Sequence, residues 1–206
     1  TLLTLIYIND AINNGASAII SNEKAVSGLG PTFINVKDTR KAASIISSRF
    51  YDNPSKDLTI IGITGTNGKT TTAYLIKECL TTAGYKTAQI GTTGVIAEGY
   101  KQEKTLTTPD AITIQKLLRS LVNDGFSHVI MEVSSHALHQ LRVSEIHFDV
   151  AIFTNLTPEH LDYHKTMKNY FNSKSRLFNL LKEKNGKAII NYDDNYGKKL
   201  ISKINC

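Results

Sequence analysis

The sequence predicts an α/β protein with a mostly parallel, doubly wound sheet, preceded by a small partial α/β domain. After residue 56, short and nearly continuous apolar runs alternate with amphipathic runs. Apolar strands of this kind are typical of parallel sheets that are buried on both faces. A glycine-rich turn joins the first of these runs to a helical pattern, as open α/β sheets require. The polar run at 52–57 contains a proline and marks the boundary between the two parts.

Residues 1–55 predict the small partial domain. Apolar runs at 18–20 and 32–36 predict two short strands. Residues 39–51 predict a helix with an apolar face formed by Ala42, Ile45, Ile46 and Phe50. These elements are too few to make a complete domain.

Residues 56–206 predict the larger domain. Its strands are expected at 58–63, 86–90, 128–133, 150–154 and 187–191. One helix is expected at 69–83, with Ala73, Ile76, Cys79, Leu80 and Ala83 as its buried stripe and Gly84 as its stop. A second helix is expected to carry Pro109 in its first turn, to be capped by Thr108 and to run to Gly125. A third, long helix is expected at 167–184.

Composition excludes several classes of protein. Hydrophobic residues make up 41% of the chain and charged residues 20%, which is the balance of an ordinary globular protein rather than a disordered or collagen-like one. No apolar run approaches the roughly 18–20 residues that span a bilayer, and the first residues lack a signal-peptide pattern. Two cysteines, Cys79 and Cys206, make no disulfide framework. We therefore expect a cytoplasmic monomer without membrane insertion.

The net charge of +6 is concentrated near the end of the chain. Residues 165–206 hold 10 basic and 3 acidic side chains, interleaved with Asn, Tyr and Leu at helical spacing. This segment lacks the arginine-rich or aromatic stacking pattern of a nucleic-acid surface. A solvated helix face explains the charge better, so we expect no nucleic-acid partner.

The segment GITGTNGKT at 62–70 predicts a phosphate-binding loop (P-loop) between a strand and a helix. Gly65 and Gly68 let successive backbone N–H groups point at one phosphate, Lys69 supplies charge and Thr70 supplies a hydroxyl for Mg²⁺. A strict P-loop would have glycine in place of Ile63. The order of strand, loop, Lys-Thr and amphipathic helix still favours nucleotide triphosphate binding over a purely structural turn. The residues expected to bind the nucleotide are Gly65, Thr66, Asn67, Gly68, Lys69, Thr70 and Thr71.

Glu132 ends a predicted strand, at the position where P-loop proteins commonly place an acid that helps to hold Mg²⁺. Ser134 and the residues after it follow at the carboxyl end of this strand, where open α/β sheets bind ligands. His160 and His164 have the i, i+4 spacing of a zinc helix, but neither a general-base glutamate nor a third ligand accompanies them. A role for His160 beside phosphate-bound Mg²⁺ is the better hypothesis.

Lys174 lies in the middle of an apolar helical stripe that includes Tyr170, Phe171, Leu177 and Phe178. A lysine in such a stripe usually extends its amine to solvent. The alternative is an amine in a partly desolvated site, where burial lowers the lysine pKa and allows neutral-amine chemistry. Helical spacing alone leaves both alternatives open.

Six motifs taken together resemble the Mur ligase family. They are GTNGKTT at 65–71, TTPD at 107–110, EVSSHAL at 132–138, Gln140 with Arg142, TNLTPEHLDYH at 154–164 and YFNSKSRLF at 170–178. The resemblance covers the central domain well and the first fifty-odd residues more loosely. Small departures are Leu106, Ala137 and Glu159, where the family commonly has Asn, Gly and Asp.

The resemblance implies a role for each matched position. Lys69 and its loop would bind ATP. The Mg²⁺ ions would be held by Thr70, Glu132 and His160. Lys174 would be a carbamylated lysine whose carbamate binds or orients a second Mg²⁺. The catalytic residues would be Lys69, Lys174 and His160. Positions that would contact the UDP-linked substrate are Thr107, Thr108, Ser134, Gln140 and Arg142.

The implied activity is the ATP-dependent addition of the third residue, meso-diaminopimelate or L-lysine, to UDP-MurNAc-L-Ala-D-Glu through an acyl phosphate in peptidoglycan synthesis. Residues 1–55 would be part of the UDP-substrate domain and 56–206 the ATP-binding domain. The resemblance also implies that a C-terminal ligase domain is missing and that the chain alone is inactive. A folylpolyglutamate synthase and a non-catalytic P-loop protein remain the alternatives.

Overall fold

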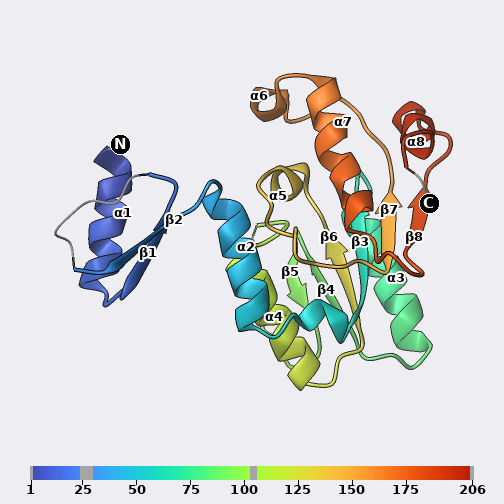
Figure 1. Ribbon diagram of the computed structural model, residues 1–206. Helices are drawn as coiled ribbons and strands as arrows, with labels where there is room; N and C mark the ends of the chain where they lie inside the picture. Colours follow the sequence, from blue (N-terminus) through green and yellow to red (C-terminus); the bar gives the residue numbers. More distant parts are fainter. Residues whose placement is uncertain (1, 24–29, 103–105, 205–206) are drawn as a thin grey trace. The chain divides into compact units, whose positions relative to one another are not determined.

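The computed structural model describes residues 2–23, 30–102 and 106–204, which excludes Cys206. The chain divides into two compact units, Thr1–Ala43 and Ser44–Cys206, each of which is described by itself. In the first unit, helix α1 (Leu2–Asn13) precedes strands β1 (Ala18–Ser21) and β2 (Thr32–Asn35), which pair in parallel (Figure 1). Both strands confirm the sequence prediction, whereas α1 had no specific prediction.

Helix α2 (Thr39–Phe50) crosses the division between the units, which lies before the expected boundary after residue 55. The predicted apolar face of this helix is wrong. Its buried residues are Ser44, Ser47 and Ser48, whereas Phe50 is 76% exposed. The serine face is buried because small side chains allow close packing and their hydroxyls find partners. The Ser144 hydroxyl donates to Ser44 Oγ at 3.0 Å, for example.

The second unit contains a six-stranded sheet in the order β5-β4-β6-β3-β7-β8. All neighbouring strands are parallel except β4 and β5. The five predicted strands are confirmed with small shifts at their ends, and the three-residue β5 was not predicted. The strands are β3 (Thr59–Thr64), β4 (Thr87–Gly91), β5 (Gly94–Ile96), β6 (His128–Glu132), β7 (Val150–Phe153) and β8 (Lys187–Ile190).

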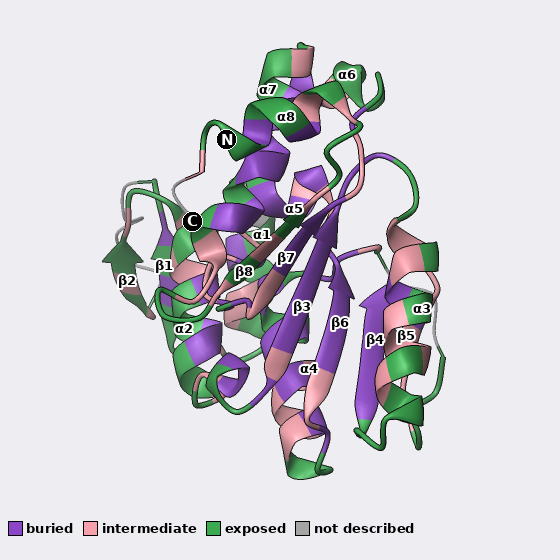
Figure 2. Ribbon diagram, turned by 90° about the vertical axis from the view of Figure 1, so that its right-hand side faces the viewer, coloured by how far each residue is buried: buried purple, intermediate pink, exposed green. Residues whose placement is uncertain are grey.

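Helices cover both faces of this sheet, which confirms the doubly wound fold. On one face, Ile114, Leu118 and Leu121 of helix α4 (Ala111–Asn123) join the main hydrophobic core. On the other face, Ala73 of helix α3 (Lys69–Thr82) packs against Ile63 and its neighbours. Figure 2 shows strands β3, β4 and β6 buried along most of their length. The predicted stripe of α3 was wrong at Cys79 and Ala83, which are both exposed.

Two predicted helix boundaries are also wrong. The N-cap of α4 is Asp110, whose carboxylate accepts hydrogen bonds from the N–H groups of Ile112 and Thr113, so neither Thr108 nor Pro109 begins the helix. The helix expected at 167–184 is shorter, because α7 (Met167–Ser175) continues only as the 3₁₀ helix η2 (Arg176–Leu180). The chain then turns to pair with Phe148, whose backbone exchanges hydrogen bonds with Leu180 and Lys182.

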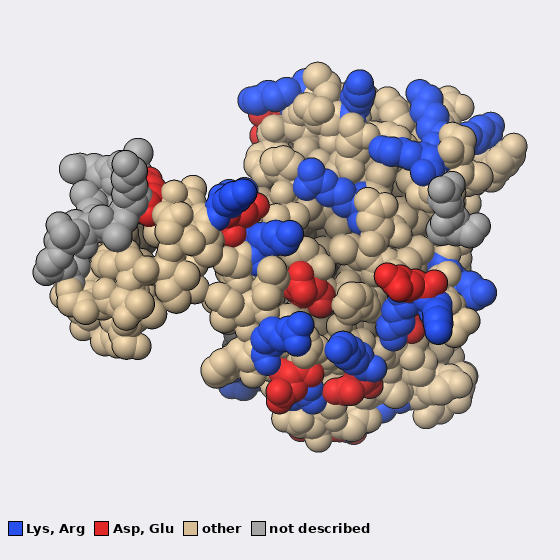
Figure 3. All heavy atoms as spheres, in the orientation of Figure 1, with Lys and Arg blue, Asp and Glu red and all other residues tan. Residues whose placement is uncertain are grey.

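Four short helices complete the second unit: η1 (Pro54–Lys56), α5 (Ser135–His139), α6 (Leu161–His164) and α8 (Asn195–Ile201). Within the described ranges, no helix has the length and apolar character that crossing a membrane requires. Figure 3 shows basic side chains on the surface around α7 and α8, where the sequence has its local positive charge.

Candidate functional site

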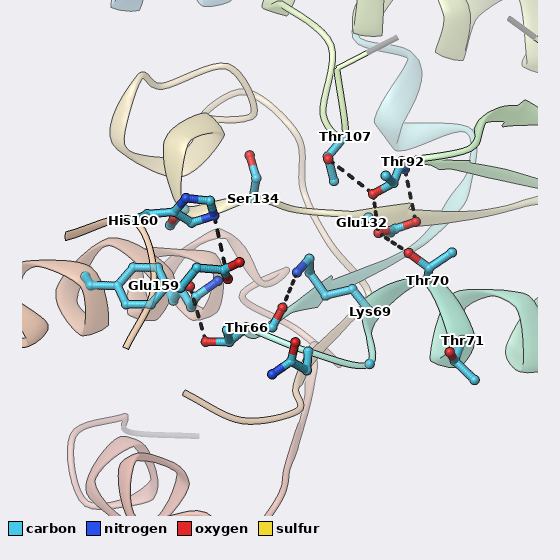
Figure 4. Close-up of a pocket in the computed structure, with 15 residues that line it drawn as sticks. Thr66, Lys69, Thr70, Thr71, Thr92, Thr107, Glu132, Ser134, Glu159 and His160 are labelled. Carbon is cyan, nitrogen blue, oxygen red and sulfur yellow. Dashed lines mark hydrogen bonds and ion pairs between the residues drawn. The ribbon is translucent and has the colours of Figure 1, made fainter. Parts of the chain in front are cut away.

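The candidate site is a cavity of about 400 Å³ at the carboxyl edge of the sheet (Figure 4). Strands β3, β4, β6 and β7 end there, and their following loops supply its walls, together with α7. Open α/β sheets bind ligands at this edge. The cavity is lined by Thr66, Asn67, Gly68, Lys69, Thr70, Thr71, Thr92, Thr107, Glu132, Ser134, Ser135, Glu159, His160, Tyr170 and Lys174.

The loop between β3 and α3 is held by the end of β7. The N–H of Thr66 donates to Asn155 O at 2.9 Å, and the N–H of Asn67 donates to Asn155 Oδ1 at 3.0 Å. Gly65 has φ +151°, and a Cβ at this position would lie 1.9 Å from Thr154 Oγ1. Glycine is therefore required here for packing and backbone conformation. The first N–H groups of α3 point toward the same edge, as a phosphate site needs.

The side chain of Lys69 lies over this loop. Its Nζ donates to Gly65 O at 2.9 Å and to Thr66 O at 2.8 Å. Burial lowers the pKa of Lys69, while the nearby carboxylates of Glu132 and Glu159 act in the opposite direction. The amine thus lies inside the cavity, and neighbouring carboxylates balance its charge only in part. It is therefore a suitable partner for a phosphate.

Glu132 is a fully buried carboxylate that faces the P-loop threonine (Figure 4). It accepts hydrogen bonds from Thr70 Oγ1 at 2.9 Å and from both the N–H and the hydroxyl of Thr92 at 3.1 Å. Gly91 leaves room for it, because a Cβ there would lie 2.1 Å from Glu132 Oε1. Within the part of the chain that the structure describes, no lysine or arginine forms an ion pair with it. A buried carboxylate among hydroxyl oxygens fits a hard cation such as Mg²⁺.

Lys174 is only 2% exposed, so its amine does not reach solvent, and the desolvated alternative is the one that the structure supports. Its Nζ donates to Gly65 O at 2.6 Å and lies 4.7 Å from the centroid of the Tyr170 ring. Burial, followed by the repulsion of Lys69, lowers the pKa of Lys174 to about 7. Lys69 and Lys174 therefore donate to the same carbonyl oxygen.

His160 lines the cavity from a left-handed backbone position (φ 55°) just before α6. Its Nε2 lies 3.7 Å from Glu159 Oε2. His164 does not line the cavity, and its buried ring pairs through Nε2 with Ser135 Oγ at 2.9 Å. Among the described residues, no group of three or more His, Cys, Asp or Glu could hold a metal by itself. The two histidines thus lack the geometry of a zinc site.

The five residues expected to contact the UDP-linked substrate separate into two groups. Thr107 and Ser134 line the cavity. Thr108 is buried, and its hydroxyl donates to Glu132 O at 2.9 Å, which holds the turn after β6. Gln140 and Arg142 lie just outside the cavity, and Arg142 Nη1 donates to Thr108 O at 2.8 Å.

Three residues that shape the cavity were not predicted from the sequence. Thr92 contacts Glu132, and its only signal was a position two residues after a predicted strand. Asn155 holds the P-loop by hydrogen bonds. It lies within a motif that was recognised as a whole, but no role was predicted for this residue. The Tyr170 hydroxyl lies 3.2 Å from Thr66 Oγ1, but in the sequence this residue was counted only as part of an apolar stripe.

The fold and this site define a P-loop α/β domain, and residues 63–206 match the Mur ligase middle domain. The chain belongs to the Mur ligase family. It is 46% identical over 202 residues to the UDP-N-acetylmuramoyl-L-alanyl-D-glutamate--2,6-diaminopimelate ligase of Clostridium botulinum, and 45% identical over 198 residues to that of Clostridium perfringens. Each alignment covers 96% of this chain and 40–41% of the relative.

A solved UDP-N-acetylmuramoyl-L-alanyl-D-glutamate--2,6-diaminopimelate ligase has the same fold, with a TM-score of 0.80 and 33% identity. The likeness covers 96% of this chain and 39% of that structure. The chain thus spans about 40% of the length of the relatives that it matches.

Proposed function

We propose that this chain supplies the nucleotide-binding part of an ATP-dependent ligase that joins 2,6-diaminopimelate to UDP-MurNAc-L-Ala-D-Glu in peptidoglycan synthesis. The observation that carries the proposal is the meeting of Lys69, Thr70 and Glu132 at one cavity, in a chain 46% identical to a relative of that name. The relatives' names favour 2,6-diaminopimelate over L-lysine. We further propose that residues 1–55 belong to the UDP-substrate domain and 56–206 to the ATP-binding domain. Because the substrate is a nucleotide-linked intermediate, we propose a cytoplasmic location.

In the proposed arrangement, residues 65–71 hold the phosphates of ATP. The first N–H groups of α3 and the Lys69 amine supply the positive charge that a phosphate needs. Thr70 and Glu132 would hold one Mg²⁺, and His160 with the carbamate of Lys174 would hold a second. Bound Mg²⁺ neutralises phosphate charge. Thr107 and Ser134 would contact the UDP-linked substrate from the cavity wall, and Gln140 and Arg142 would contact it from beside the cavity, with buried Thr108 holding the turn behind them.

Carbamylation of Lys174 would follow from its surroundings. The neutral amine nitrogen attacks the carbon of CO₂ and releases one proton, which leaves an N–H and a carboxylate on the side chain. The remaining N–H can keep the hydrogen bond to Gly65 O, now 2.6 Å long. The buried amine, with its pKa lowered to about 7, is available in neutral form at physiological pH.

The proposed reaction has two steps. The side-chain carboxylate of D-Glu attacks the terminal phosphate of ATP and forms an acyl phosphate with release of ADP. The amine of diaminopimelate then attacks the acyl carbon, and phosphate leaves. Lys69 stabilises the charge that develops on the transferred phosphoryl group, while the cavity walls orient the reacting groups.

Calorimetry on the 206-residue chain tests this proposal. ATP should bind to the unaltered chain, more tightly with Mg²⁺, and Lys69→Ala should abolish measurable binding. Glu132→Gln should remove the Mg²⁺ dependence while leaving weaker metal-free binding. Lys77→Ala, on the same helix but outside the cavity, is the matched control. An unchanged affinity of Lys69→Ala for ATP would contradict the assignment of the nucleotide site. Mass spectrometry of the UDP-linked product made by the complete ligase separates an enzyme from a non-catalytic P-loop protein.

A further inference from the structure

The Tyr163 hydroxyl joins two short segments that are far apart in the sequence. It lies 2.8 Å from Nδ1 of His139 and 3.2 Å from Nε2 of Gln140. Tyr163 belongs to α6, which follows the cavity residues Glu159 and His160, whereas His139 and Gln140 end the α5 segment after Glu132. One hydroxyl thus ties the two sides of the site together.

The hydrogen bonds around this hydroxyl have a defined direction. The Arg142 guanidinium can only donate, and its Nε and Nη2 both donate to Oε1 of Gln140. The Gln140 amide must therefore turn its NH₂ group toward Tyr163, whose oxygen accepts. The Tyr163 proton is then free to donate to His139 Nδ1. The chain Arg142, Gln140, Tyr163 and His139 fixes the orientation of each member.

The ring of Tyr163 is held independently of its hydroxyl. It packs against the His136 ring at a centroid distance of 4.3 Å, and the next residue, His164, is anchored on Ser135. A phenylalanine at this position would keep the ring contact and lose only the hydroxyl. The contribution of the hydroxyl can therefore be tested separately from packing.

The network leaves a defined part of Arg142 available. Its Nε and one N–H of Nη2 serve Gln140, and one N–H of Nη1 serves Thr108 O. Of its five N–H groups, one on each terminal nitrogen remains without an acceptor among the residues that the structure describes. Each of these two N–H groups can donate to an oxygen of a carboxylate or phosphate.

We propose that Tyr163 is a positioning residue that acts through Gln140 to hold Arg142 ready for an anionic group of the substrate. This inference rests on the proposed function, which places Gln140 and Arg142 on the side of the UDP-linked substrate. It adds that α6 connects the phosphate side of the cavity to the substrate side. Tyr163 itself need not touch the ligand.

NMR on the 206-residue chain gives the first test, because it needs no ligand. Hydrogen exchange at Arg142 Nε should be about fivefold faster in Tyr163→Phe, since one hydrogen bond that orders Gln140 is lost. Tyr192→Phe is the matched control, because Tyr192 is 67% exposed and its sequence neighbours belong to no part of this network. Unchanged exchange in Tyr163→Phe overturns the proposal.

Binding of UDP-MurNAc-L-Ala-D-Glu gives the second test, through a double-mutant cycle. Tyr163→Phe should weaken this binding about fivefold in the unaltered background and have no further effect beside Gln140→Ala. ADP affinity should stay the same in all variants. Equal losses in both backgrounds would show a merely structural role and overturn the proposal. If the unaltered complete ligase fails to bind the UDP-linked substrate, the proposed function fails, while the exchange measurement on the 206-residue chain still decides the role of Tyr163.

Discussion

The buried amine of Lys174 makes stability depend on pH in a direction that can be worked out. In the unfolded chain a lysine keeps its proton up to about pH 10.5, whereas in the folded chain the pKa of Lys174 is about 7. Between these values the unfolded state binds more protons, so the free energy of unfolding rises with pH. Below pH 7 both states are protonated and Lys174 contributes no slope.

We therefore expect Lys174→Met to flatten the rise in stability between pH 7 and pH 10, by an amount on the order of a few kcal/mol. The measurement is urea unfolding across this range in CO₂-free buffer, so that the amine stays unmodified. A smaller slope should remain, because burial also lowers the pKa of Lys69. Lys168→Met, at an exposed position of the same helix, should leave the slope as it is. An equally steep slope in Lys174→Met would contradict the expectation.

Single residues could be predicted from the sequence where a local pattern fixes their surroundings. Lys69 and Thr70 follow from the loop pattern and Glu132 from its place at the end of a strand, whereas the apolar stripe around Lys174 left its burial open. Thr92 and Asn155 could not be found in this way. Their partners, Glu132 and the P-loop, come from other strands, and no local periodicity reports contacts between strand ends.

At the scale of elements, the P-loop makes unequal demands on its two glycines. A Cβ at Gly65 would collide with Thr154 Oγ1, whereas a Cβ at Gly68 would meet nothing within 4 Å. At Gly68 the only constraint is the left-handed backbone conformation, φ +84°, which glycine adopts without strain. The loop is thus packed at its start and open at its end.

Gly65→Ala should consequently weaken nucleotide binding at least ~100-fold, because the loop must separate from the end of β7. Gly68→Ala should cost ~1–2 kcal/mol, or roughly tenfold, as a left-handed alanine does. Calorimetric titration with ADP compares the two variants directly. A larger loss in Gly68→Ala than in Gly65→Ala would show that packing against Thr154 is not what holds the loop.

Element types were easier to predict than their ends and their buried faces. Strand positions followed from apolar runs, but the helix at 167–184 ends early because Leu181 and Lys182 pair with Phe148, a contact 33 residues away from Leu181 in the chain. Helix α2 buries serines rather than its isoleucines because small side chains fit closely where hydroxyl partners are present. Hydrophobic periodicity contains no information about such partners.

For the whole molecule, the place of α2 decides which piece of the chain folds alone. Its second half belongs to the second unit, where Arg119 donates to the backbone carbonyls of Tyr51 and Asp52 just after the helix. Asp38 caps the start of α2 by accepting from the N–H groups of Arg40 and Lys41. The natural starting point for an isolated second unit is therefore residue 38.

We expect residues 38–206 to fold cooperatively and to bind ADP with the affinity of the full chain. Residues 54–206, which begin at the seam seen in the sequence, should have a lower melting temperature by several degrees or more, because buried Ser44 and Ser47 leave their partners uncovered. Circular dichroism melts and ADP titration measure both fragments. Equal stability of the two fragments would place the division at the seam after all.

The carbonyl oxygen that Lys69 and Lys174 share has a consequence for how quickly a nucleotide can leave. Before a phosphate enters, two of the three N–H groups of Lys69 donate to Gly65 O and Thr66 O, so these carbonyls compete with a phosphate for the amine. A phosphate contact that replaces these two bonds is weaker by their free energy, and the bonds form again when the nucleotide departs. The same competition from the loop carbonyls acts on ATP and on ADP. It favours rapid exchange of the nucleotide over tight binding. Release of ADP would then be accompanied by the return of Lys69 to Gly65 O and Thr66 O.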